Sequence, residues 1–184
     1  MLWLREVNKS IKEYLQTLYT NVKNVDGTLI DIPVIIRTPQ TDALEETLPC
    51  ISIYTYDMND NLRMTDLNSK EYKTEGKVVT VKDKPLKRNI GVQIDFYTHT
   101  LGLMDELTYK WITSNRPHSM IDITDSEGNI YACPFKRKGS PVRVDMPDYG
   151  DILYRVSYSH TVIIPITYEP QQMVMIEKVL PNIK

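Results

Sequence analysis

The chain of 184 residues is long enough to bury a core as one domain, and its composition, 41% hydrophobic and 25% charged, is that of a folded globular protein. A formal net charge of −2 at pH 7 argues against tight nucleic-acid binding, which calls for a strongly basic surface. The sequence shows neither a secretory leader nor an apolar stretch of about 20 residues, so we expect cytoplasmic synthesis and no membrane span.

The N-terminal part of the chain predicts one helix and two strands. Apolar residues recur at spacings of three and four across residues 4–22, the pattern of an amphipathic helix. An isoleucine-rich run at 30–36 and an alternating run at 50–56 predict strands. Pro33 cannot donate to a ladder, so the first strand is expected at a sheet edge or at a strand beginning. Cys50 is expected to be a small buried core residue.

Residues 57–88 form a long, highly charged stretch between two predicted strands. Loops of this length in compact domains are usually functional or disordered. We interpret the stretch as an extended hairpin or arm, with a flexible solvated loop as the alternative. The arm residues expected to contact a neighbouring subunit are Lys70, Glu71, Tyr72, Lys73, Glu75, Lys77 and Val79.

The C-terminal half predicts strands around a second helix. Residues 89–97 alternate between apolar and polar side chains, and an apolar face recurs from Leu103 to Ile112 after a plausible N-cap at Thr100. A hairpin around 120–133 and a long alternating strand at 154–164 follow. These elements predict one α+β domain over 1–168, with two helices on one face of a mainly antiparallel sheet, and a C-terminal extension over 169–184.

Catalytic and metal-binding patterns are not recognisable in the sequence. It lacks the glycine-rich phosphate loops, the nucleophile elbow and the paired histidines of zinc enzymes. The spacing of His99, His118, His160 and Cys133 does not match zinc ligands, and a Cys133–histidine nucleophile pair is disfavoured because Cys133 lies in a predicted strand. His160 is better explained as a structural histidine. We expect no enzyme activity, no metal and no cofactor.

Two basic clusters carry a separate hypothesis. A solvated loop is the simplest interpretation of these short charge runs. If the protein forms a ring, the same residues would line a lumen through which DNA passes, and unchanged assembly and DNA passage after replacing all seven with serine would refute this. The residues are Lys82, Lys84, Lys87, Arg88, Lys136, Arg137 and Lys138.

The order of these elements resembles that of the tail terminator, or tail-completion, proteins of tailed phages and contractile tails. The likeness rests on the helix at 4–22, the edge strand at 32–36, the proline-bounded strand at 48–53, the strand–helix unit at 92–112 and the closing strand at 154–168. It is a likeness of topology and contains no diagnostic motif. No functional residues are carried over from it.

The resemblance implies a structural protein of the virion, assembled in the bacterial cytoplasm. Its subunits would form a hexameric ring that caps the tail tube or sheath and offers a surface to neck and head-completion proteins. Edge strands and a projecting arm suit such contacts. Another neck, head-completion or baseplate component, a small non-enzymatic binding module, and an enzyme with an unrecognised site remain alternatives.

Overall fold

The computed structural model describes residues 4–36, 48–61, 70–75, 78–83, 86–148, 151–166 and 171–174. Two helices and eleven strands are defined within these ranges. They are α1 (Leu4–Leu18), β1 (Val22–Lys23), β2 (Leu29–Ile30), β3 (Val34–Ile36), β4 (Cys50–Asn61), β5 (Lys70–Glu75), β6 (Val78–Asp83), β7 (Leu86–Thr98), α4 (Leu101–Ser114), β8 (His118–Thr124), β9 (Ile130–Asp148), β10 (Asp151–Ile166) and β11 (Gln171–Val174).

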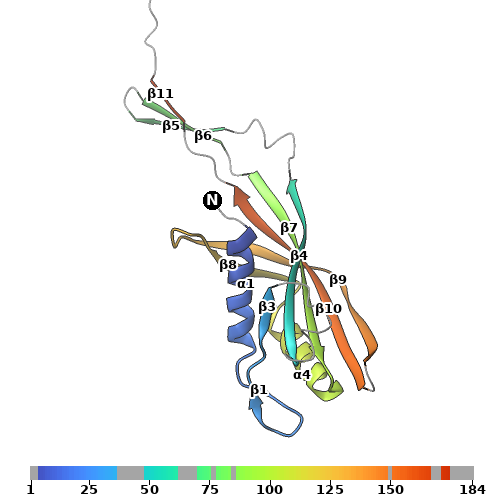
Figure 1. The fold of residues 1–184 in the computed structure, drawn as a ribbon. Coiled ribbons are helices and arrows are strands. Elements are labelled where there is room, and N and C mark those ends of the chain that lie inside the picture. The colour runs from blue at the N-terminus through green and yellow to red at the C-terminus, as the bar shows by residue number, and fades with distance from the viewer. Residues whose placement is uncertain are drawn as a thin grey trace, which may run out of the picture.

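A six-stranded sheet in the order β3-β4-β7-β10-β9-β8 forms the centre of the molecule (Figure 1). The expected α+β class is confirmed, but the expectation of a mainly antiparallel sheet needs correction because the sheet is mixed. β3 and β4 run parallel, with Val34 opposite Ile51, while the other neighbours are antiparallel. Residues 37–49 separate these two strands, which is long enough for a parallel crossover and too long for a tight hairpin.

Both helices pack against one face of this sheet, as predicted. Val7, Ile11 and Leu15 from α1 and Leu107 and Trp111 from α4 belong to one buried cluster with the apolar residues of β4, β7, β8, β9 and β10. The predicted apolar sides of the strands at 89–97 and 154–164 are therefore the sides that face the helices in the structure. α1 ends at Leu18 rather than at the predicted residue 22 because the chain turns at Asn21, whose φ is +54°.

The stretch 57–88 contributes to two of the three sheets, the six-stranded sheet and a three-stranded one. β4 continues to Asn61 and β7 begins at Leu86, while β5 and β6 between them pair antiparallel, and β11 adds to β6. Figure 1 shows this three-stranded sheet beyond the ends of β4 and β7. Residues 171–174 of the C-terminal extension thus pair with a strand of the predicted arm.

The basic run at 136–139 lies within a strand rather than in the expected solvated loop. β9 extends from Ile130 to Asp148 and pairs with β8 on one side and β10 on the other. Gly139 has a φ of +66°, and the register between β9 and β10 shifts near this position. The bulge explains why the alternation of β9 is hard to detect in the sequence.

Candidate interaction surface

The six-stranded sheet has a second face, opposite to the helices, which we call the open face. Its residues alternate with the core residues along each strand, so Gln93, Asp95 and Tyr97 of β7 and Arg155 of β10 belong to it. Among the described residues, neither helix covers this face. A small apolar cluster at one end contains Cys50, Tyr97 and Leu153, with Ile35 and Leu48 packed against it. The predicted burial of Cys50 is confirmed.

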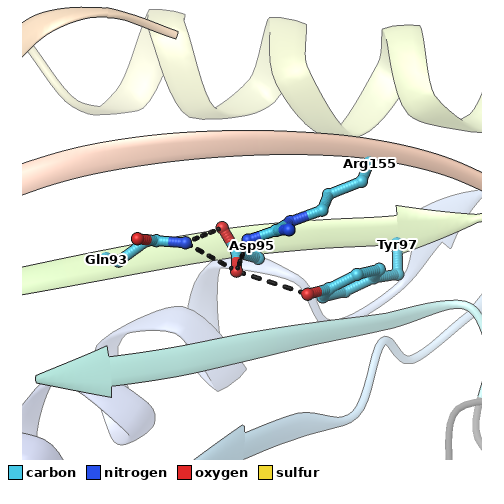
Figure 2. A network of polar contacts seen from close by, with 4 residues as sticks. All are labelled: Gln93, Asp95, Tyr97 and Arg155. Carbon is cyan, nitrogen blue, oxygen red and sulfur yellow. Dashed lines mark hydrogen bonds and ion pairs between the residues drawn. The ribbon is translucent and has the colours of Figure 1, made fainter. Parts of the chain in front are cut away.

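A polar network occupies the middle of the open face (Figure 2). The Asp95 carboxylate accepts a hydrogen bond from Arg155 Nη2 at 2.9 Å and from Gln93 Nε2 at 2.9 and 3.0 Å. The Tyr97 hydroxyl donates to the same carboxylate at 3.3 Å. The Asp95 side chain is only 4% exposed and that of Arg155 27%. A buried carboxylate is tolerated here because the guanidinium neutralises it and donors surround it.

The neighbours of Tyr97 determine the protonation state of its hydroxyl. Burial, and next the Asp95 charge, raise the pKa of Tyr97, so its hydroxyl stays protonated and donates. The Arg155 guanidinium also lies 5.6 Å from the centre of the Tyr97 ring. Because the oxygens of Asp95 are occupied by these donors, the carboxylate is poorly placed to act as a general base. The arrangement is a buried ion pair whose acceptor oxygens are filled by neighbouring donors.

Two tyrosines stand on the open face beside this network. Tyr54 and Tyr56 of β4 are stacked at 6.5 Å between ring centres, and they are 44% and 43% exposed. The register places Tyr54 opposite Gln93. Partly exposed aromatic residues held by a rigid sheet are typical anchors of protein–protein contacts.

The seven basic residues predicted to line a lumen do not share one face. Lys136 and Lys138 lie opposite Thr161 and Ser159 on the open face, where Lys87 also falls by its alternation in β7. Arg137 lies opposite the buried His160 on the helix-covered side, and Arg88 alternates with Lys87 onto that side too. Lys82 belongs to β6 and Lys84 lies outside the described residues.

The predicted interface arm corresponds to β5 and the start of β6. The register places Lys70 opposite Asp83 and Glu71 opposite Lys82. Tyr72, Lys73 and Glu75 complete β5, Val79 lies in β6, and Lys77 lies outside the described residues. Whether these residues contact a neighbouring subunit stays a prediction.

His160 and Cys133, two of the candidates for nucleophilic or metal chemistry, both lie in the buried core. His160 is buried and stacks on Phe135 at 4.5 Å, and its burial lowers its pKa to about 4. Burial, with a smaller effect of Asp122, raises the pKa of Cys133 to about 11, so the residue is a thiol at neutral pH. No group of three or more potential metal ligands occurs among the described residues, and none of their helices is suited to crossing a membrane.

The polar network is the main feature that the sequence did not predict. Its trace is present in the sequence, since positions 93, 95 and 97 interrupt an apolar strand with polar groups at every second residue. The missing information was the register of β10, which brings Arg155 opposite Tyr97 and next to Asp95.

No protein-family model matches the sequence, and no curated protein matches it. Among solved structures, the chain is similar to the PVC sheath/tube terminator of an extracellular contractile injection system, in its extended state, with a TM-score of 0.52 and 13% identity. The match covers 100% of this chain and 64% of the terminator, so the chain spans somewhat less than two thirds of its length. The chain has a terminator-like fold, and the resemblance inferred from the order of its elements is supported at that level.

Proposed function

We propose that this chain is a structural subunit of a phage tail or a related contractile particle, where it closes into a ring and caps the tube or sheath. The observation that carries the proposal is the similarity of the whole chain to a sheath/tube terminator. Its location would be the tail of the particle. Its partners would be further copies of itself, the tube or sheath protein, and the proteins of the neck.

The surface of the molecule suits an assembling subunit. The six-stranded sheet ends in two edge strands, β3 and β8, which are natural places for pairing with another chain. Its open face carries Tyr54 and Tyr56 on a rigid platform. A ring requires two different surfaces on each subunit, because every contact is heterologous and repeats around the axis.

We also propose that the protein is not an enzyme. The buried ionisable groups are explained by packing and ion pairing: Asp95 by Arg155, His160 by its aromatic neighbours, and Cys133 by its place in the core. A buried ionisable group points to catalysis only when other reactive groups converge with it, and these three groups lie in structural surroundings.

The test is the solution mass of the purified chain, measured by light scattering on a sizing column, with negative-stain images of the peak. The proposal predicts a ring, or a monomer that forms rings when it is concentrated or mixed with tail tubes. A strict monomer at every concentration, which neither binds nor caps tubes, would refute it.

A further inference from the structure

A groove runs between α1 and the edge strand β8. One part of about 510 Å³ is lined by α1 residues and by the β8 segment 120–124, and a second part of about 320 Å³ continues towards the turn after β8. The two parts share Ser10, Glu13 and Thr124, so they form one continuous depression. Figure 1 shows α1 beside β8 at this edge of the sheet.

The pairing of β8 determines which of its backbone groups face this groove. Just beyond the two ends of β8, Arg137 N–H donates to Pro117 C=O and Asp125 N–H donates to Asn129 C=O. Hydrogen-bonded positions alternate along an antiparallel pair, so the odd-numbered residues of β8 bond to β9 and the even-numbered ones point outward. The Thr124 N–H confirms this, because it donates outward to Ser10 Oγ at 3.2 Å.

Met120 and Asp122 therefore present their N–H and C=O groups to the groove. Within the described residues, no hydrogen-bond partner occurs for these outward groups, whereas α1 satisfies the next one along at Thr124. Tyr14 of α1 and the 59%-exposed Met120 supply apolar walls, and Asp122 supplies negative charge beside them. Glu13 also lines this part and is paired with Lys9 at 3.8 Å. The groove is thus shaped for one short extended strand with apolar side chains and a cation.

We propose that the C-terminal residues 175–184 of a second copy of this chain occupy the groove as an added strand beside β8. The inference deepens the proposed ring and rests on it, since it supplies one of the repeated contacts. β11 ends at Val174, and ten residues follow it. Within this segment every second residue from 176 is Ile176, Lys178 and Leu180, two apolar side chains with one lysine that can pair with Asp122.

The position of β11 favours a neighbour as the acceptor. β11 pairs with β6 in the three-stranded sheet, which lies beyond the ends of β4 and β7 (Figure 1). The segment that follows β11 therefore starts outside the helix-covered core of its own subunit. Donating it to the next copy would connect each subunit to one neighbour and leave its own β8 open to another, as a closed ring requires.

The first test uses the chain ending at Val174 and a synthetic peptide of residues 173–184. We expect saturable binding, with hydrogen exchange of the Met120 and Asp122 amides slowed by about tenfold or more. The Ile121 and Ile123 amides already face β9 and should change little. Absence of slowing at both outward amides under saturating peptide would overturn the inference.

Two variants of Asp122 distinguish the contribution of its backbone N–H to peptide binding from that of its side chain. Asp122→Pro removes the outward N–H at a position that does not bond to β9, so we expect the fold to persist and peptide binding to be lost. Asp122→Ala keeps the N–H and should retain binding with a weakening of several-fold. If thermal unfolding shows that Asp122→Pro does not fold, Met120→Pro provides the same test; equal binding to a folded proline variant would contradict the strand addition.

A mixing experiment identifies the donor. The full chain with Asp122→Pro keeps its tail, and the chain ending at Val174 keeps its groove, so neither assembles alone but a mixture should form a one-to-one complex. Protection of Met120 and Asp122 in the dilute full-length monomer would instead show that the chain fills its own groove, which overturns the assignment to a second copy. Peptide binding without ring formation or tube capping would support the groove as a binding site for the segment and refute the proposed function.

Discussion

The two faces of the six-stranded sheet differ in the polarity and exposure of their side chains. The helix-covered face is apolar, and α1 and α4 close over it around Trp111. The open face is polar at its centre, where Asp95 and Arg155 are paired, and aromatic beside it, where Tyr54 and Tyr56 are exposed. The comparison shows that the large apolar core lies on one face, while the other combines a buried ion pair and a small apolar cluster with exposed aromatic rings.

Replacing the residue at the centre of the covered face should have the largest effect. Trp111 is fully buried and its ring lies near those of Tyr14, Phe96 and Tyr158. Trp111→Ala should lower the free energy of unfolding by about 4 kcal/mol, because it opens a cavity that the helices cannot close. Ile112→Ala, at a 50%-exposed neighbouring position, should cost less than about 1 kcal/mol in the same urea titration.

Acid should also destabilise the protein, through His160 on the helix-covered face. The folded-state pKa of His160 is lowered to about 4 by burial, against about 6.5 in the unfolded chain. The unfolded state therefore binds the proton first, and stability that is complete above pH 6.5 should fall by about 3 kcal/mol as the pH approaches 4. His160→Gln should remove that part of the pH dependence in chemical denaturation. Identical slopes for both proteins would contradict the assignment.

The ion pair at the centre of the open face should also contribute to the free energy of unfolding. Arg155→Met leaves the buried Asp95 carboxylate without its cation, which should cost about 2 kcal/mol. Arg143→Met is the matched control, because Arg143 and Asp145 form a pair at 2.9 Å whose side chains are 46% and 47% exposed. That change should cost under about 1 kcal/mol. Equal losses in thermal unfolding would show that burial does not distinguish the two pairs.

The smallest effect on stability should accompany the largest effect on assembly. Tyr54→Ser combined with Tyr56→Ser should change the free energy of unfolding by less than about 1 kcal/mol, since both rings are substantially exposed. The same change should shift the solution mass from ring towards monomer at fixed concentration. Tyr109→Ser, which is 67% exposed on α4, should leave the mass unchanged. Retained rings in the double variant would exclude these tyrosines from the contact.

Predictions from the sequence were most accurate for elements that have a single hydrophobic periodicity. The alternation at 89–97 and 154–164 and the three-and-four spacing of α1 identify the buried sides correctly, because each element has one apolar face. The parallel pairing of β3 with β4 could not be read in this way, since periodicity reports which side is buried and not the direction of a neighbour. The length of the connection over 37–49 was the available signal.

The candidate surface was harder to predict than the fold. Lys136, Arg137 and Lys138 are adjacent in sequence but alternate across β9, so a run that resembles one patch divides between two faces. The Asp95–Arg155 pair joins residues 60 positions apart and depends on the register of two long strands. Charge composition alone contains neither piece of information.

The most direct measurement of the central claim is the length distribution of tail tubes or sheaths assembled with and without this chain, with the chain located by an electron-dense label. We predict label at one end of each tube and an arrest of further growth once the end is occupied. Label along the tube walls, or tubes that continue to grow from labelled ends, would contradict the terminator role.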